Sequence, residues 1–174
     1  MEFGMFHQFP ALPGRSEREA FEEAFAQIDA AERWGLDVMW LAELHFDPQR
    51  SVLSAPLSIA SAVAARTNRI KIGIAVQVLP LCHPLRIAEE GATVDQISGG
   101  RLIFGVGRSG LPRTYEDYGV SYAESRDRFL EVLDIVAIFS NCKADSSLLH
   151  GCDSARRDLF GALQPRAVGR RHLA

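Results

Sequence analysis

A carboxylate and an imidazole stand two residues apart after a short apolar run. Glu43 and His45 follow Val38 to Ala42, a run of strand length. Because side chains in a strand alternate with a period of two, both would lie on one side if the strand continued. A carboxylate beside an imidazole can hold its tautomer and tune its pKa, which suits proton transfer near neutral pH. The alternative is a loop histidine paired with Asp47, and the residues alone leave both readings open.

A glycine-rich segment follows a later apolar run. Gly105, Gly107 and Gly110 match the pattern G-x-G-x-x-G of dinucleotide-binding turns. Such a turn belongs to the first strand–helix connection and opens into an apolar helix, whereas residues 111–120 read as a loop without an apolar stripe. The context therefore argues against a plain dinucleotide-binding module. Arg108 offers a positive fork for a phosphate, or is merely solvated on a tight turn.

The elements that must position these residues follow from apolar runs that alternate with helical patterns. Runs of strand type cover residues 3–7, 38–42, 70–79 and 102–106, and helical patterns cover residues 16–35, 54–65, 84–100 and 121–136. Strands that read as continuous apolar runs between amphipathic helices predict a parallel sheet covered by helices. Right-handed crossovers leave an open doubly wound sheet or part of a (β/α)8 barrel. In both, chemistry takes place at the carboxyl ends of the strands.

Three local features sharpen this prediction. The pairs Ser16–Glu19 and Ser121–Glu124 have the spacing of capping boxes, and we expect each to begin a helix. The first strand, residues 3–7, is mostly apolar, and we expect it to be buried.

Composition excludes several classes of protein. The 174 residues suit one domain, and 47% hydrophobic and 24% charged residues are ordinary for a soluble globular chain. A net charge of −3 gives no general attraction to nucleic acid. No apolar stretch approaches roughly 18 residues and no secretory signal is present, so we expect a cytoplasmic protein without a membrane partner. Three irregularly spaced cysteines and scattered histidines predict no metal site.

The last part of the chain differs from the rest. Residues 141–174 carry a net charge of +3, whereas residues 1–140 carry −6, and the apolar periodicity stops near Phe139. We therefore expect residues 1–140 to form one structural block. We expect residues 141–174 to be an atypical tail, irregular or partly disordered.

Three motifs taken together resemble the luciferase-like flavin-dependent monooxygenase family. They are WLAELHF at 40–46, GIAVQVLPLCHPLRIAEE at 73–90 and DQISGGRLIFGVGRSG at 95–110, and the resemblance covers residues 1–140. It implies a (β/α)8 barrel and an often dimeric oxidoreductase that uses reduced FMN and O2 on a small organic substrate. One branch of the family uses the deazaflavin F420 instead. F420-dependent hydride transfer and a non-catalytic fragment are thus the alternatives.

The resemblance also implies roles for individual residues. Ala75 and Val76 occupy the place of a small-residue pair whose peptide bond, sometimes cis, lies against the flavin ring. Arg108 matches an arginine that contacts the flavin phosphate, and Gly107 stands where the luciferase branch has a cysteine beside the flavin. Together with Ser109, these residues form the implied cofactor-binding set.

The same comparison places Glu43 and His45 near the reaction centre. The luciferase branch has two histidines after the glutamate, and here Leu44 takes the place of the first. Light emission is therefore not expected. The chain supplies four of the eight strands of a barrel, a truncated half whose first and fourth strands would be open apolar edges. Two such halves could close on each other as a symmetric homodimer.

Overall fold

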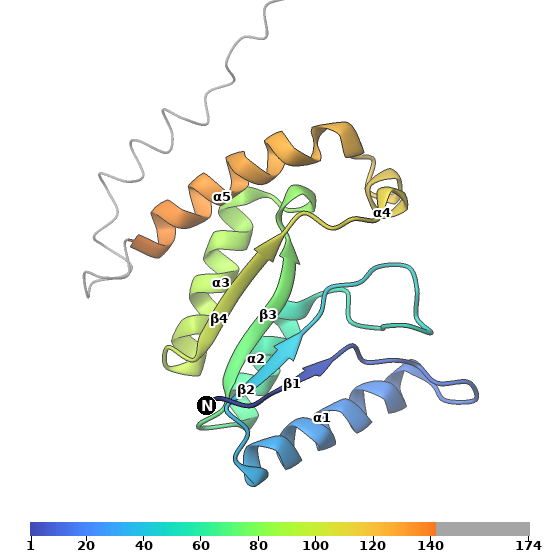
Figure 1. Cartoon of the computed structure of the whole chain (residues 1–174), viewed down its shortest axis with the longest axis vertical. Helices are drawn as coiled ribbons and strands as arrows, with labels where there is room; N and C mark the ends of the chain where they lie inside the picture. Colours follow the sequence, from blue (N-terminus) through green and yellow to red (C-terminus); the bar gives the residue numbers. More distant parts are fainter. Residues whose placement is uncertain (142–174) are drawn as a thin grey trace, which may run out of the picture.

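A computed structural model describes residues 1–141 of the chain as four β/α units whose strands form one parallel sheet (Figure 1). The strands pair in the order β1-β2-β3-β4. The elements are β1 (Gly4–His7), α1 (Glu17–Trp34), β2 (Val38–Leu41), α2 (Pro56–Arg66), β3 (Lys71–Val78), η1 (Leu79–Leu81), α3 (Pro84–Ser98), β4 (Leu102–Gly107), α4 (Pro112–Asp117), η2 (Tyr122–Glu124) and α5 (Ser125–Asn141). The predicted tail lies, from residue 142 onward, outside the described residues.

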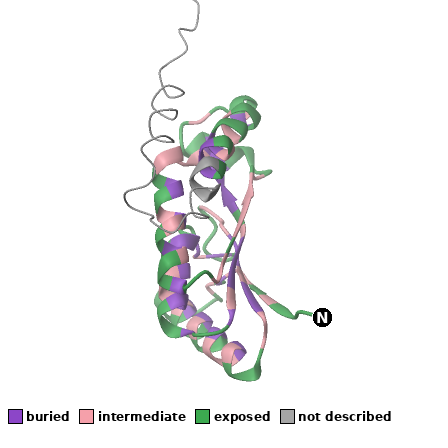
Figure 2. Ribbon diagram, turned by 90° about the vertical axis from the view of Figure 1, so that its left-hand side faces the viewer, coloured by how far each residue is buried: buried purple, intermediate pink, exposed green. Residues whose placement is uncertain are grey.

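The predicted α/β fold with four β/α units is confirmed. All three strand pairs are parallel, so the carboxyl ends of the strands meet along one edge of the sheet. Figure 2 shows the long helices on one side of the strands. On the opposite face the register row Phe6–Trp40–Gly73–Ile103 leaves Phe6 53% and Ile103 37% exposed. This one-sided cover is the arrangement of a barrel wall, with helices outside.

The core lies between the sheet and these helices. Its strand side chains are fully buried because alternate positions of β2 and β3 face the helices. Each such side chain contributes about 1.5–3 kcal/mol relative to an exposed position. The fully buried members from strands and helices include Met39, Leu41, Ile72, Ile74, Ile28 and Val63.

Three expectations about individual elements are wrong. The first strand is not buried: β1 alternates between exposed and half-buried residues because it pairs on one side only. Residues 111–120 are not only a loop, since α4 begins there at Pro112. The spacing of Ser121 and Glu124 does not make a capping box, because Ser121 precedes the short turn η2 and makes no capping hydrogen bond with its side chain.

The capping box at Ser16 and Glu19 is confirmed, with both reciprocal hydrogen bonds formed. The helix that it begins ends at Gly35, which adopts the left-handed conformation at φ 85°. Within residues 1–141, no helix combines the length and the apolar character needed to cross a membrane.

Candidate active site at the carboxyl edge of the sheet

The carboxylate of Glu43 is the centre of a hydrogen-bond cluster just beyond β2. Its Oε2 accepts from the backbone N–H of Val78 at 2.8 Å and from the side-chain amide of Gln77 at 2.6 Å. Its Oε1 lies 2.9 Å from Nε2 of His45. The Glu43 side chain is only 3% exposed, so these donors replace water around it. Glu43 thereby ties the loop after β2 to the end of β3.

His45 extends this cluster to a tyrosine from a different loop. Because an ionised carboxylate only accepts hydrogen bonds, the network assigns a proton to Nε2 of His45. In the neutral ring Nδ1 is then an acceptor, and the hydroxyl of Tyr118 donates to it at 3.2 Å. The two rings meet edge to face with centroids 5.1 Å apart. Hydrogen bonds thus run from the buried Glu43 carboxylate to Tyr118, which is 44% exposed.

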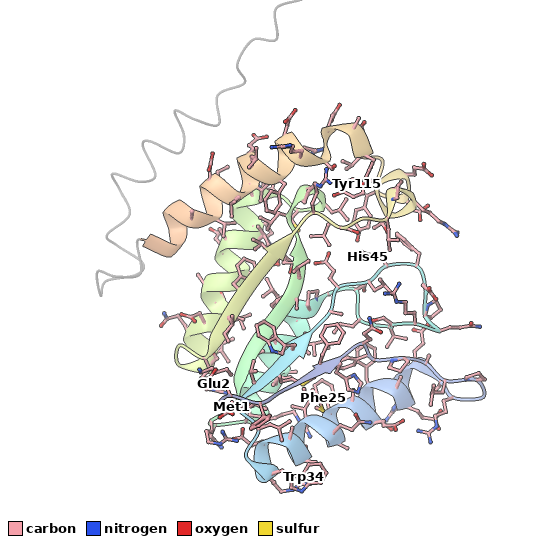
Figure 3. All side chains as sticks on the ribbon, viewed as in Figure 1. Met1, Glu2, Phe25, Trp34, His45 and Tyr115 are labelled. Atoms are coloured by element: carbon pink, nitrogen blue, oxygen red, sulfur yellow. The ribbon has the colours of Figure 1, made fainter. Side chains whose placement is uncertain are left out.

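The predicted alternative, in which His45 pairs with Asp47, is wrong. Asp47 Oδ1 accepts instead from the backbone N–H of Arg50 at 3.3 Å, within its own turn. The carboxylate that reaches the imidazole is the one two residues before it. Figure 3 places the labelled His45 beyond the strand ends, at the same end of the sheet as Tyr115.

The end of β3 contains an irregularity at the predicted position. The peptide bond between Ala75 and Val76 is cis. The pairing of β3 with β4 shifts register between Ile74 and Gln77, so the cis bond falls inside this shift. Val76 is 37% exposed, whereas Gln77 is 5% exposed and contacts Glu43.

Gly107, the last residue of β4, lies directly against Val76. A Cβ atom at this glycine would lie 2.5 Å from Val76 Cγ2, so any side chain there requires Val76 to move. This contact explains why the sequence has glycine where the resemblance places a cysteine. The ends of β3 and β4 are therefore in close contact at Val76 and Gly107, which form a junction between the two strands.

Arg108 is exposed and extends from this junction towards α5. Its guanidinium donates a hydrogen bond to Ser125 Oγ at 3.2 Å and lies 5.7 Å from the centre of the Tyr122 ring. Within residues 1–141, no carboxylate lies within ion-pair distance of it. The next residue, Ser109, has a positive φ of 59°, and its hydroxyl accepts from the backbone N–H of Leu111.

Burial and the Glu43 charge act on two acidic groups near the cluster. Burial is the main cause that raises the pKa of the Cys82 thiol to about 12, and the Glu43 carboxylate adds to it. Burial, with Glu43 again adding, also raises the pKa of Tyr118. Cys82 is therefore a neutral thiol near pH 7 rather than a nucleophile. Tyr118 keeps the proton that it donates to His45.

A pocket of about 180 Å³ adjoins the cluster. It lies between the carboxyl ends of β2 and β3 and the helices α2 and α3. Its lining is partly polar and partly aliphatic, and consists of Glu43, His45, Ser54, Ala55, Pro56, Leu57, Ser58, Gln77, Leu81, Cys82, Ile87, Glu90 and Tyr118.

The structure brings the predicted residues together in two groups. Glu43 and His45 form one group, and Val76 and Gly107 form the other. Arg108 follows the second group along the same edge. Gln77 and Tyr118, which complete the first group, were not predicted as site residues.

For Gln77 a signal was present, because a polar side chain interrupts the apolar run that follows Lys71 in β3, near the carboxyl end of the strand. Tyr118 carried no comparable signal, since its place beside His45 depends on how the segment after β4 folds.

Four parallel β/α units with polar side chains gathered at the carboxyl edge define an α/β protein whose sheet is consistent with half of a (β/α)8 barrel. The luciferase-like monooxygenase family model matches residues 1–140, and the chain belongs to this family. The alkanal monooxygenase alpha chain of the Kryptophanaron alfredi symbiont is 30% identical over 136 residues, which cover 78% of this chain and 38% of that protein. The chain matches only 28% to 39% of the length of this protein and three other curated relatives.

Solved structures agree with this assignment. The monooxygenase RslO1 from Streptomyces bottropensis has a TM-score of 0.73 at 32% identity, covering 78% of this chain and 42% of that chain. The oxygenating constituent of 3,6-diketocamphane monooxygenase from Pseudomonas putida, solved with FMN, has a TM-score of 0.71 at 28% identity, covering 78% and 38%.

A coenzyme F420-dependent tetrahydromethanopterin reductase from Methanopyrus kandleri has a TM-score of 0.51 at 24% identity, covering 75% and 38%, and shows the fold alone. The four units thus correspond to about two fifths of such barrels, in agreement with the prediction of half a barrel.

Proposed function

We propose that this chain belongs to an enzyme that uses reduced FMN and O2 to oxygenate a small organic substrate. The observation that carries the proposal is the meeting, at one sheet edge, of the Glu43–His45 pair with the Val76–Gly107 junction. In this proposal Glu43 and His45 serve the reaction centre. The cofactor would be held by Ala75, Val76, Gly107, Arg108 and Ser109.

The residues at this edge fit a flavin mononucleotide. Gly107 adds no side chain to the junction, and the exposed side chain of Val76 offers an apolar surface for a planar ring. Arg108 meets no carboxylate of residues 1–141, so its guanidinium donors suit a phosphate, which they bind in a forked geometry. The FMN complex of the related oxygenating constituent supports the choice of FMN over F420.

When bound, reduced flavin supplies the electrons and the activation of O2, and the protein supplies binding, orientation and electrostatics. Glu43 fixes the ring of His45 and its tautomer through the hydrogen bond at Nε2. His45 Nδ1 can take up a proton, and Glu43 would stabilise the imidazolium that forms. Tyr118 holds a proton at its hydroxyl oxygen, at the exposed end of the same hydrogen-bond chain.

A comparison of FMN with riboflavin, which lacks the phosphate, tests the proposal. We expect the full chain to bind FMN saturably and more tightly than riboflavin, by about 10-fold to 100-fold, because of the charge-assisted contact with Arg108. Arg108→Gln should remove that difference. Arg113→Gln is a matched control, since Arg113 is an exposed arginine of α4 that pairs only loosely with Asp117 at 3.9 Å.

Other outcomes would assign the chain differently. Absence of FMN binding, or equal affinity for FMN and riboflavin, would refute the assigned phosphate site. Binding of F420 in place of FMN would favour a hydride-transfer enzyme. FMN binding without oxygen consumption, tested with reduced FMN and a panel of aldehydes and amines, would favour a non-catalytic fragment.

A further inference from the structure

The turn that carries Arg108 is held against α4 by a buried tyrosine. Arg108 and Ser109 stand between Gly107 and Gly110, so few side chains fix the backbone at this point. The hydroxyl of Tyr115, in α4, donates a hydrogen bond to the carbonyl oxygen of Arg108. Tyr115 is fully buried, and Figure 3 places it at the same end of the sheet as His45. Its hydroxyl therefore anchors the Arg108 backbone to a packed element.

The Tyr115 hydroxyl keeps its proton at neutral pH. Burial raises the pKa of Tyr115, while the Arg108 charge and a hydrogen bond with Ser125 act against this rise. A protonated phenol is a hydrogen-bond donor, which is what a carbonyl oxygen requires. A phenylalanine would have the same ring and no donor, so the hydroxyl is the part of this side chain that holds the turn.

The guanidinium of Arg108 is held by two neighbours of Tyr115. Its central carbon lies 5.7 Å from the centre of the Tyr122 ring, within the range of a cation–π interaction. The Tyr122 ring in turn meets the Tyr115 ring edge to face, with centroids 5.1 Å apart and planes at 83°. Ser125, which is fully buried, accepts from Nη1 of Arg108 at 3.2 Å. Tyr115, Tyr122 and Ser125 thus fix both the backbone and the side chain of an exposed arginine.

These contacts leave most of the guanidinium free to bind a ligand. An arginine has five N–H donors, and within residues 1–141 only the bond to Ser125 engages one of them. A long side chain that is already held in place loses less conformational freedom when it binds a ligand. The cluster therefore supports the Arg108 guanidinium from one side and leaves donors for an anion.

We propose that Tyr115 is a positioning residue for the guanidinium of Arg108, acting through its hydrogen bond to the Arg108 carbonyl and its ring contact with Tyr122. Tyr122 is the second positioning residue, because its ring faces the guanidinium. The inference rests on the proposed function, in which Arg108 binds the phosphate of the cofactor. It predicts that both tyrosines affect the preference for FMN over riboflavin, which lacks the phosphate, and do not affect the affinity for riboflavin.

The first test compares the parent chain with Tyr115→Phe, which keeps the ring and removes the hydroxyl. Titration of the full chain followed by flavin fluorescence gives the affinities for FMN and for riboflavin. We expect FMN to bind about twofold to tenfold more weakly, the factor that one hydrogen bond contributes, and riboflavin affinity to stay within about twofold. An equal loss for both flavins would show a merely structural role and overturn the proposal, and so would an unchanged preference for FMN.

Two substitutions of the less buried Tyr122 test the same support without touching the buried hydroxyl. Tyr122→Leu removes the aromatic ring and should lower the preference for FMN about twofold to fivefold, the range of a partly exposed cation–π contact. Tyr122→Phe retains the ring and should keep the preference of the parent chain. Equal preferences in these two variants would contradict the role of the ring.

A double-mutant cycle with Arg108→Gln shows whether Tyr115 acts through the arginine. In the Arg108→Gln background, Tyr115→Phe should have no further effect on the preference for FMN, because the group that it positions is absent. The same loss in both backgrounds would overturn the proposal. The parent chain separates the two possible failures. Equal affinity of the parent for FMN and riboflavin would refute the proposed phosphate site and this inference with it, whereas a preference that persists in Tyr115→Phe would refute this inference alone.

Discussion

Two substitutions of Glu43, one by alanine and one by glutamine, distinguish the contribution of its hydrogen bonds to stability from that of its negative charge. Glu43→Ala leaves three donors near the carboxylate without a partner: the amide of Gln77, the N–H of Val78 and the ring N–H of His45. A buried donor without an acceptor costs about 1–3 kcal/mol. Since water can reach some of them through the adjoining pocket, we expect unfolding free energy to fall by about 2–5 kcal/mol.

Glu43→Gln should be much milder, because the hydrogen bonds can be rearranged. Gln77 and Val78 both donate to the same oxygen, Oε2, which a glutamine oxygen can replace. The new amide would then face His45, whose ring can move its proton to Nδ1 and accept at Nε2. Tyr118 would become the acceptor of that proton. We expect a loss of about 1 kcal/mol or less, since neutral hydrogen bonds replace charge-assisted ones while a buried charge is removed.

Two measurements check this reasoning. Urea unfolding followed by circular dichroism gives the free energies of the two variants, and ¹⁵N NMR of the imidazole gives the tautomer of His45. The expected result is a large loss for alanine, a small loss for glutamine and a change of tautomer only in Glu43→Gln. An alanine variant within about 1 kcal/mol of the parent chain, or an unchanged tautomer in Glu43→Gln, would refute the network as described.

Further predictions concern Tyr118, the glycines Gly105 and Gly110, and the dependence of stability on pH. Tyr118→Phe should cost about 0.5–1.5 kcal/mol in urea unfolding and shift the Nδ1 resonance of His45, and an unchanged resonance would mean that the hydroxyl does not donate there. Gly105→Ala should lower the unfolding midpoint strongly, because its Cβ would meet a carbonyl oxygen of β3, whereas Gly110→Ala has open space and should change it little. Burial lowers the pKa of His7 below 6.5, because the folded chain disfavours the charged imidazole. The neutral imidazole therefore supports the folded state above pH 6.5, and this stabilisation is lost as the pH falls below that value. His7→Gln should flatten this dependence in unfolding measurements between about pH 7.5 and pH 5, and an unchanged slope would show that another group titrates.

Much of the fold follows from the sequence because the relevant signals are local. The capping pair at Ser16 and the glycine at Gly35 fix both ends of α1 without reference to the rest of the chain. The β-branched run of β3 indicates a buried central strand for the same reason. Where the outcome depends on neighbours, the sequence misleads. The Ser121–Glu124 spacing matches a capping box, but α5 begins after it, and β1 is apolar although it lies at an edge.

The candidate site shows the same division. The pairing of Glu43 with His45 could be predicted because they lie two positions apart and both follow one strand. The link from His45 to Tyr118 joins positions 73 residues apart, and no spacing rule encodes it. The role of Gln77 likewise depends on the register shift that brings its amide to Glu43. Such contacts depend on the relative positions of the ends of β2, β3 and β4. These positions cannot be deduced from the spacing of residues in one sequence.

Glu43, His45 and Tyr118 differ in how accessible they are to a ligand, which the sequence alone does not show. Glu43 makes three hydrogen bonds and is 3% exposed, so in the proposed site a ligand would contact His45 or Tyr118 rather than Glu43 itself. His45 is itself 7% exposed at its side chain and occupied at both nitrogens. Of these three groups, the hydroxyl of Tyr118 is therefore the one that a substrate above the strand ends would meet first. The family resemblance places Leu44 where the luciferase branch has its first histidine, so in the proposed function a proton that this cluster exchanges with a substrate would pass through Tyr118. Tyr118 belongs to the segment after β4, whereas His45 follows β2. The proposed proton exchange would therefore depend on how the segment after β4 is folded.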